Sequence, residues 1–243
     1  MTVVVLPPMS AAQEQAWAAL LEITERLPSG WCLVGGQMVH LHCVERGVVP
    51  QRPTDDADAA LDVRSRPAML AVFTGVLVDL GFTSAGESLE GHQHRWVRDA
   101  ARIDVLIPRH VGARATARRG VTGGTTLESP GTQQALDRTE TVTVRLGERV
   151  GQVLRPDLLG ALVGKAGAHT VTQDRHPQRH LLDFVILCAL IRPADRVGVR
   201  ATRRDRQYLD RMLEVLDADG TAWASIGNGR AGVARLRLAL SGD

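Results

Sequence analysis

Residues 35–58 read GGQMVHLHCVERGVVPQRPTDDAD, and this stretch decides the expected fold. The adjacent glycines Gly35 and Gly36 follow a short apolar run at residues 31–34 and precede a segment of helical character at residues 37–45. This order predicts a buried strand, a tight glycine turn and a helix. Glycine backbones and helix N-terminal amides can approach an anion closely, although this order of elements is common in proteins that mix helices and strands.

An acidic cluster ends the same stretch. Asp56 and Asp58 open a segment that continues as Ala59-Ala60-Leu61-Asp62-Val63, so we expect them on a β-strand, where residues two apart project from one face. Two carboxylates that point to one place suit a hard cation such as Mg²⁺. We therefore expect Asp56 and Asp58 to be metal ligands. Such acid pairs also occur on solvated strand ends, and that structural interpretation remains open.

The composition is that of an ordinary globular protein. The chain has 243 residues, of which 44% are apolar and 23% are charged. No apolar run approaches the roughly 18 residues that cross a membrane, and the amino terminus lacks a basic-then-apolar signal pattern. These features predict a cytoplasmic protein with no membrane partner, built as one large domain or two small ones.

Charge is distributed unevenly along the chain. Residues 1–62 carry eight acids and three bases, a net charge of −5, and the whole chain carries +2, which leaves +7 for the remainder. Arginines cluster in residues 109–119 and 192–211, where they could meet the phosphates of a nucleotide or a nucleic acid. The alternative is a solvated helix, because Asp195, Asp205 and Asp210 interleave with the second cluster.

Periodicity and turn residues predict the remaining elements. We expect a first helix at residues 11–26 capped by Ser10. Further helices are expected at 67–80, from Pro156 toward Lys165, and at 178–191, 203–216 and 230–240, with strand pairs at 92–97 with 102–107 and at 141–146 with 150–154.

The pattern divides the chain into two parts. Residues 108–133 are rich in Gly, Thr, Ser and Arg without sustained periodicity, which predicts a mobile loop. The strand-containing part precedes a purely helical part, so we predict an α/β (α+β) fold with a core at residues 1–154 and a helical region at residues 155–243.

Three further residues lie in unusual settings. Lys165 is the only lysine among 29 Lys and Arg residues, which indicates either a specific contact with a phosphate or chance survival. Asp104 and Asp183 each lie in an apolar segment, where a carboxylate needs a positive partner. A shared metal would compensate Asp104, and the alternative is an ion pair with Arg95 or Arg102. Asp183 is expected to face a cleft or to meet a cation. The structural alternative is an ion pair with Arg179, four residues earlier on the same helix.

Cysteine and histidine spacing gives no metal motif. Cys32, Cys43 and Cys188 each lie in an apolar stretch without CxxC spacing, which favours buried free thiols. His176 and His180 are four residues apart but do not form an HExxH arrangement, so we do not expect zinc.

Together these motifs resemble the AbiEii-type nucleotidyltransferase toxin family, which includes MenT-type toxins, within the polymerase-β-like superfamily. The resemblance covers roughly residues 31–190 and is strongest at VGGQMVHLH, RPTDDADAAL and RIDVLIP. It implies a polymerase-β-like core with a mixed sheet, followed by helices that complete the active site. It also implies an NTP substrate, two Mg²⁺ ions, a tRNA acceptor and a cognate antitoxin protein.

The resemblance assigns roles to individual residues. Gly35, Gly36 and Thr54 correspond to nucleotide-binding positions, and Asp56, Asp58 and Asp104 to metal ligands, with Asp104 alternatively the general base. Lys165 would hold the NTP phosphates, and Asp183 would position or support them. The implied reaction is in-line attack of an acceptor hydroxyl on the α-phosphorus with release of pyrophosphate.

The acceptor remains open at this point. The first hypothesis is a toxin that adds a nucleotide to the 3′ end of tRNA. A second keeps the chemistry but places the nucleotide on a small molecule or a protein hydroxyl. A third is a non-catalytic module that binds nucleotides or RNA. Aromatic residues make up only 3% of the chain, so any RNA contact should be mostly to backbone phosphate.

Overall fold

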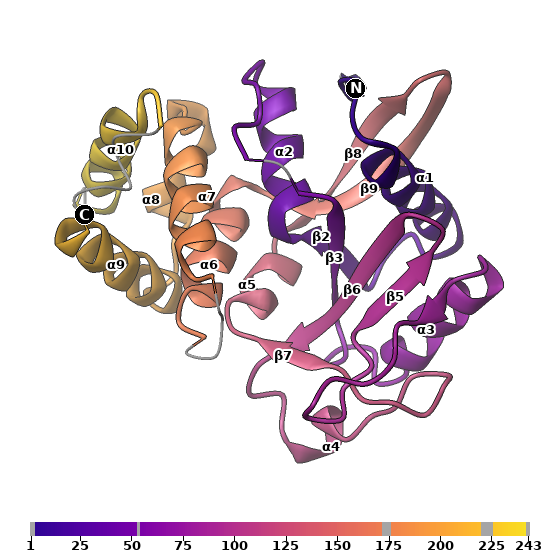
Figure 1. Cartoon of the computed structure of the whole chain (residues 1–243). Coiled ribbons are helices and arrows are strands. Elements are labelled where there is room, and N and C mark those ends of the chain that lie inside the picture. The colour runs from indigo at the N-terminus through magenta and orange to yellow at the C-terminus, as the bar shows by residue number, and fades with distance from the viewer. Residues whose placement is uncertain (1–2, 53, 172–175, 220–225, 242–243) are drawn as a thin grey trace.

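The computed structural model describes residues 3–52, 54–171, 176–219 and 226–241 (Figure 1). The strands are β1 (Val3–Val5), β2 (Trp31–Val34), β3 (Asp56–Leu61), β4 (Thr83–Ser84), β5 (Arg95–Arg98), β6 (Ala101–Pro108), β7 (Leu127–Ser129), β8 (Thr139–Leu146) and β9 (Arg149–Pro156). The helices are α1 (Ala11–Arg26), α2 (Gly35–Glu45), α3 (Met69–Asp79), α4 (Ala113–Thr116), α5 (Thr132–Leu136), α6 (Leu158–Ala168), α7 (Gln178–Ala189), α8 (Val197–Arg200), α9 (Arg203–Ala218) and α10 (Gly229–Ser241), with a 3-10 turn at Pro193–Asp195.

A mixed sheet organises the first part of the chain. Within the described residues its strand order is β2, β3, β6, β5, β4, and β7 pairs with β6. Strand β3 runs antiparallel to β2 and parallel to β6, and β5 runs antiparallel to β6. The parallel pair β3 and β6 therefore lies inside the sheet, and the residues of these two strands meet side by side.

Local sequence explains where several helices begin. Ser10 and Gln13 form a capping box at the start of α1, in which each side chain accepts from the backbone amide of the other. Thr202 and Asp205 do the same at the start of α9. Asp157 caps α6 by accepting from the amide of Gly160 at 2.8 Å. These caps satisfy amides that a helix terminus otherwise leaves without a partner.

A second sheet forms from segments at the two ends of the strand-containing part. Strands β8 and β9 form an antiparallel hairpin, and β1 pairs in parallel with β8. Helix α1 packs between this sheet and the main sheet, since it contacts β9 on one side and β3 and β6 on the other. Trp17, Leu20 and Leu21 of α1 are almost fully buried there.

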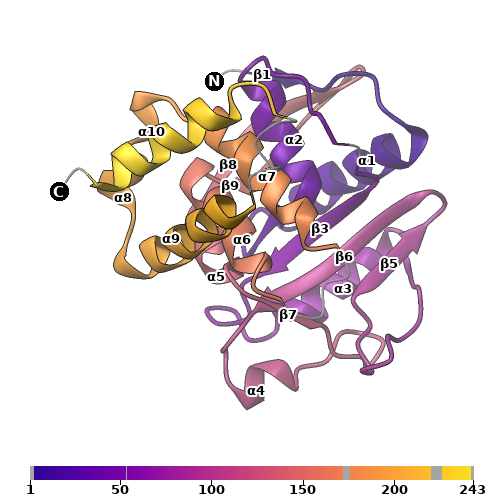
Figure 2. The same ribbon diagram turned by 60° about the vertical axis from the view of Figure 1, so that its left-hand side comes forward.

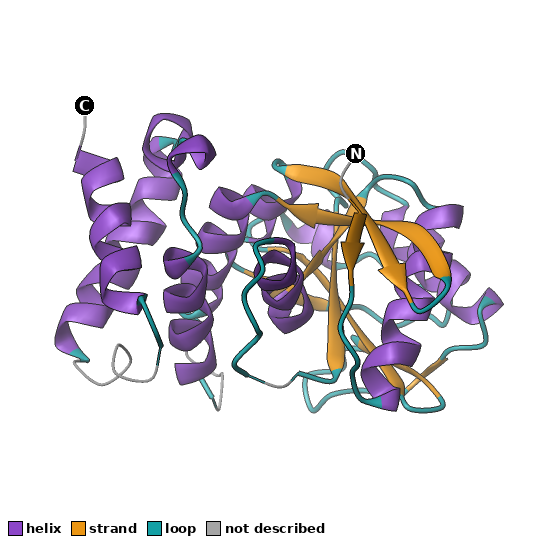
Figure 3. Ribbon diagram, turned by 90° about the horizontal axis from the view of Figure 1, so that it is seen from above, coloured by secondary structure: helices purple, strands orange, loops and turns teal. Residues whose placement is uncertain are grey.

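The helices after β9 gather on one side of the molecule. Figures 2 and 3 show the helices of this region beside the strand-containing part, and in Figure 1 α9 and α10 lie farthest from the main sheet. Helices α6 and α7 contact each other and also contact α2. Buried apolar residues of both parts belong to one continuous hydrophobic cluster. This packing brings α6 and α7, together with their side chains, close to the first turn of α2.

The α/β fold class, with a mixed sheet followed by helices, is confirmed. Both predicted strand pairs are antiparallel hairpins, and the helices expected in the first and last parts of the chain are present, with ends that differ by a few residues. The cysteines are free and buried, as expected. None of the helices in the described residues is both long enough and apolar enough to span a membrane. The division into residues 1–154 and 155–243 remains a prediction.

Two local predictions were wrong. The segment at residues 108–133 is not one irregular loop, because it contains α4, β7 and the start of α5. Strand β7 is ordered by hydrogen bonds to residues 106–108 at the end of β6. Thr126, the residue before β7, is buried. The glycine pair is also not a turn that precedes the helix, because α2 already begins at Gly35.

Candidate functional site

Strand β3 presents Asp56 and Asp58 on one face. Exposure alternates along its first residues, so that both acids are half-buried while Ala57 between them is fully buried. Two residues apart on a strand share a face, as the sequence predicted. Asp58 pairs in register with Val34 of β2, the residue directly before the first glycine of α2. The carboxylates therefore lie beside the start of α2.

Strand β6 places Asp104 next to Asp58. The two residues are direct partners in the parallel register of β3 and β6, so their side chains leave the same face of the sheet. The side chain of Asp104 is only 13% exposed. The acids at residues 56, 58 and 104, which lie far apart in sequence, thus occupy neighbouring positions on one sheet face.

An arginine from the next strand joins two of these acids. Arg95 of β5 is the register partner of Asp104, and its Nε and Nη2 donate to the two Asp104 oxygens at 2.8 and 2.7 Å. The same Nη2 donates to Oδ2 of Asp56 at 3.1 Å. Of the interpretations open for Asp104, the structure shows the ion pair with Arg95. The bidentate geometry is the strong form of an arginine-carboxylate contact.

The glycine pair packs tightly against the acidic motif, with Gly35 next to Asp58 and Gly36 next to Thr54. An added Cβ at Gly35 would lie 1.7 Å from Oδ2 of Asp58, and one at Gly36 would lie 2.6 Å from Oγ1 of Thr54. Gly35 also has a φ of +71°, which residues with a side chain rarely adopt. The backbone oxygen of Thr54 accepts from the side-chain amides of Gln37 and Gln13 at 2.6 and 2.8 Å, which fixes the segment before β3. Pro53 of this motif lies outside the described residues.

Alanine at Gly35 should therefore cost more stability than alanine at Gly47. Both glycines have a φ near +70°, but an added Cβ at Gly47 meets nothing within 4 Å. Gly47→Ala should lose about 1 kcal/mol from backbone strain alone, and Gly35→Ala about 3 kcal/mol because it also displaces Asp58. Urea unfolding of the two variants measures the difference. Equal losses would show that the contact with Asp58 is not tight.

A second charged cluster lies on α6 and α7, the helices that contact α2. Lys165 of α6 donates to Oδ2 of Asp183 on α7 at 2.7 Å, and both side chains are almost fully buried. Arg52 donates to both Asp183 oxygens at 3.1 Å. Burial alone would raise the pKa of Asp183, but Lys165 and Arg52 outweigh that effect and hold the pKa below its usual range. Asp183 is therefore an ionised carboxylate held by two cations.

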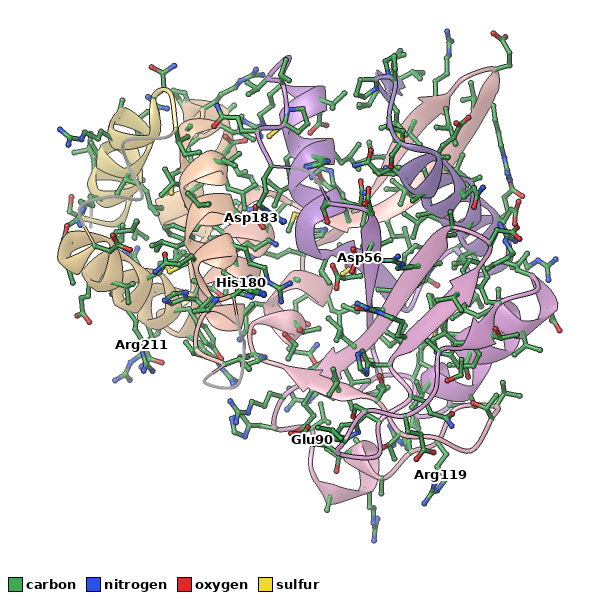
Figure 4. The ribbon with its side chains drawn as sticks, viewed as in Figure 1. Asp56, Glu90, Arg119, His180, Asp183 and Arg211 are labelled. Carbon is green, nitrogen blue, oxygen red and sulfur yellow. The ribbon has the colours of Figure 1, made fainter. Side chains whose placement is uncertain are left out.

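The Lys165 cluster and the sheet acids influence each other electrostatically. Burial and the charges of Asp104 and Asp56 together raise the pKa of Asp58 to about 7, although Lys165 and Arg179 oppose the rise. Lys165 thus acts on Asp58 as well as on Asp183. Figure 4 shows Asp56 on the sheet, across from the helix that carries His180 and Asp183. The arrangement brings every predicted site residue into one region around the start of α2.

The raised pKa of Asp58 predicts how stability depends on pH without metal. In the unfolded chain Asp58 loses its proton near pH 3.8, whereas in the folded protein it keeps the proton until about pH 7. The folded state therefore binds more protons in this range, and the free energy of unfolding should fall as the pH rises from about 4 to about 7, by at most about 4 kcal/mol.

Comparison with Asp58→Asn isolates this effect, because the amide does not titrate in this range. The free energy of unfolding of the variant, minus that of the unmodified protein, should increase from pH 5 to pH 8. Urea unfolding in the presence of a chelator measures this difference at both pH values. A stability difference that is the same at both pH values would contradict the assignment.

One contact of the site was not predicted, and a second was predicted only in part. The partnership of Arg52 with Asp183 joins residues 131 positions apart, and its only sequence signal is that Arg52 opens the RPTDDAD motif. The bridge from Arg95 to both Asp56 and Asp104 was foreseen only as one alternative for Asp104. No group of three or more His, Cys, Asp or Glu residues within the described part of the chain is arranged to hold a metal ion. The metal assignment of the three acids therefore remains a proposal.

The fold resembles that of a solved nucleotidyltransferase-like protein. An antigenic nucleotidyltransferase-like protein from Paracoccidioides brasiliensis aligns with a TM-score of 0.52 and 15% identity, covering 89% of this chain and 94% of that chain. The antibiotic-resistance factor ANT(2'')-Ia aligns with a TM-score of 0.43 and 14% identity, covering 87% and 98%. Neither a protein-family model nor a curated protein matches the sequence.

The first of these likenesses defines the class of fold, which is nucleotidyltransferase-like. At this level of identity a shared fold does not establish a shared activity, because one fold hosts many chemistries. Function has to be argued from the acids, the glycine pair and the buried lysine themselves.

Proposed function

We propose that the chain is a metal-dependent nucleotidyltransferase, which transfers a nucleoside monophosphate from an NTP to an acceptor hydroxyl and releases pyrophosphate. One observation carries the proposal: Asp58 and Asp104 lie in register on adjacent strands, with Gly35 at the start of α2 packed against Asp58. Carboxylates beside a glycine-started helix would offer cation ligands next to amides that are able to bind phosphate. Neither feature alone would point to this chemistry.

The case for a divalent cation rests on the chemistry of the acids, because the described residues do not already form a metal-binding arrangement. Asp56 and Asp104 already bracket one positive group, the Arg95 guanidinium, and Asp58 holds a proton near neutral pH because no cation fully compensates its burial. Carboxylate oxygens are the ligands that Mg²⁺ prefers in sites completed by substrate phosphates. Bound there by Asp56, Asp58 and Asp104, magnesium ions would neutralise the charge that develops on the phosphate oxygens. Arg95 would have to release Asp56 and Asp104 for this binding.

The chain's own cations and amides would hold the triphosphate. Val34, the residue before α2, gives no side-chain cap, so the first amides of the helix depend on other partners. The ammonium group of Lys165 has three protons, and its one hydrogen bond within the described residues is to Asp183. Asp183 would orient this ammonium toward the phosphates. In the alternative role that the resemblance gives it, Asp104 would not bind metal and would instead accept the proton of the attacking hydroxyl.

The finer proposal is that the acceptor is the 3′ end of tRNA and that the protein is the toxin of a toxin-antitoxin pair. Support comes from the sequence resemblance at the glycine pair, the acidic motif and the Asp104 strand, together with the excess of positive charge after residue 62. A cognate antitoxin would then restrain the enzyme in the cell. With few aromatic residues, the protein would recognise tRNA mainly through its phosphates and shape.

Incubation with each of the four NTPs, labelled at the α-phosphate, tests both levels of the proposal. Each reaction contains magnesium and total tRNA, and a parallel series uses the Asp58→Asn protein. Label on tRNA only with the unmodified protein would support the acceptor and identify the nucleotide. Label on the protein itself or on an added small-molecule acceptor would keep the chemistry but replace tRNA. The absence of both NTP binding and transfer would rule out the enzyme.

A further inference from the structure

Three arginines from separate segments line one small cavity away from the acids. Arg64 follows the carboxyl end of β3, Arg109 follows that of β6, and Arg204 lies in the first turn of α9. The cavity has a volume of about 40 Å³, and its remaining lining includes Gln133, Gln134, Tyr208 and His110. All three arginines are exposed to solvent. The fold thus gathers positive charge that is scattered over 140 residues of sequence.

Nearby acids do not neutralise these arginines. In the described part of the chain, Arg64, Arg109 and Arg204 have no ion pair with an acid, although many other arginines do. Asp205, which follows Arg204 directly, is fully buried and bonded to Arg138 at 2.6 Å. Clustered guanidinium groups without acid partners repel one another, so the cluster favours an anionic ligand.

A glutamine side chain at the same cavity adds an independent indication. Gln134 of α5 is only 7% exposed, and its side chain lines the same cavity. Among the residues that the structure describes, this side chain has no hydrogen-bond partner. The amide nitrogen and oxygen are not among the fully buried unpartnered atoms, so they stay accessible from the cavity, where the amide can donate to a ligand oxygen. Guanidinium and amide donors around a space of this size match a phosphate group better than a base or a sugar.

We propose that Arg64, Arg109 and Arg204 form a phosphate-binding site for the backbone of the RNA acceptor. This inference rests on the proposed function, since it names how that acceptor is held. Arg64 is six residues beyond Asp58 along the chain, a span of at most about 22 Å. An RNA strand with its end at the acids can reach this distance within a few nucleotides. The site would therefore hold a phosphate upstream of the reacting end.

The test compares two triple variants that remove the same charge. One carries Arg64→Gln, Arg109→Gln and Arg204→Gln. The matched control carries Arg114→Gln, Arg145→Gln and Arg211→Gln, three exposed arginines outside the cavity that also have no acid partner among the described residues. Figure 4 shows Arg211 extending outward from α9. Thermal unfolding first establishes that both variants are folded.

Binding of fluorescently labelled tRNA is then measured by anisotropy over a series of salt concentrations, without NTP. The cavity variant should bind tRNA at least about tenfold more weakly, with a salt slope lower by about one, because one phosphate contact is lost. The control variant should lose much less tRNA affinity, and the affinity of both variants for Mg-NTP should be unchanged.

Two outcomes would overturn the inference. The first is an equal loss of tRNA affinity in both variants, which would mean that only total charge matters. The second is unchanged tRNA binding in the cavity variant. If inorganic phosphate raises the unfolding temperature of the unmodified protein but not that of the cavity variant, the cavity binds a free small anion instead. The binding assay contains no NTP and does not depend on nucleotidyl transfer. Failure of the catalytic proposal is therefore seen separately, when the unmodified protein does not bind NTP or does not transfer label.

Discussion

Asp58→Asn is expected to lower nucleotidyl transfer by about 1000-fold or more while the protein stays folded. Asp58 is the acid that lies against Gly35 and in register with Asp104, so its carboxylate lies where the proposed cation and the triphosphate would meet. The amide has nearly the same shape but cannot balance the charge of a cation. The measurement is the rate of labelled transfer at saturating magnesium and NTP, with circular dichroism as the check of folding.

Asp55→Asn is the matched control for this variant. Asp55 belongs to the same acidic motif, but it is exposed and accepts a hydrogen bond from the hydroxyl of Ser10 at 3.0 Å. Its replacement should change the rate by less than about threefold, since a surface hydrogen bond of this kind contributes little. Transfer within about tenfold of the unmodified rate in folded Asp58→Asn would falsify the catalytic assignment.

The second large effect is expected on stability, in Asp183→Ala. This change removes the carboxylate that holds Lys165 and Arg52 and leaves the almost fully buried ammonium without compensation. Breaking a buried pair by removing one partner costs about 3–5 kcal/mol. Urea unfolding at pH 7 measures the loss, and magnesium-free buffer separates it from any effect of metal binding.

An exposed pair of the same length provides the control. Arg237 and Asp217 are also 2.7 Å apart, but their side chains are 44% and 60% exposed. Asp217→Ala should therefore cost no more than about 1 kcal/mol. The double variant Lys165→Met with Asp183→Leu should be more stable than Asp183→Ala, because it removes the buried charge from both sides. A loss below about 1 kcal/mol in Asp183→Ala would show that the ammonium finds other compensation.

Elements with strong local signals were predictable from the sequence. The helix at residues 11–26 has its capping residue Ser10 directly before an amphipathic pattern, and the hairpin at 139–156 has a Gly147 turn between two alternating strands. In these segments propensity, pattern and turn residues agree. Strand β1 and strand β7 were not foreseen, because three-residue strands are defined by the partner strand that they meet.

The candidate site was predictable as a list of residues but not as an arrangement. Acids in apolar segments, adjacent glycines and a lone lysine stand out because each is costly or unusual in its setting. Their partners do not stand out in this way. Arg95 and Arg52 are two of many arginines, and only the sheet register and the packing of α7 select them for Asp104 and Asp183.

The sequence by itself determined the α/β class, the order of most elements and the identity of the acids that need a positive partner. Hydrophobic periodicity, caps and turns carry this information because they act over a few neighbouring residues. Only the tertiary structure decided that Asp58 lies beside Asp104 and beneath Gly35, and that arginines 64, 109 and 204 share one cavity. Strand register and helix packing join residues distant in sequence, and no local pattern encodes which of them will meet.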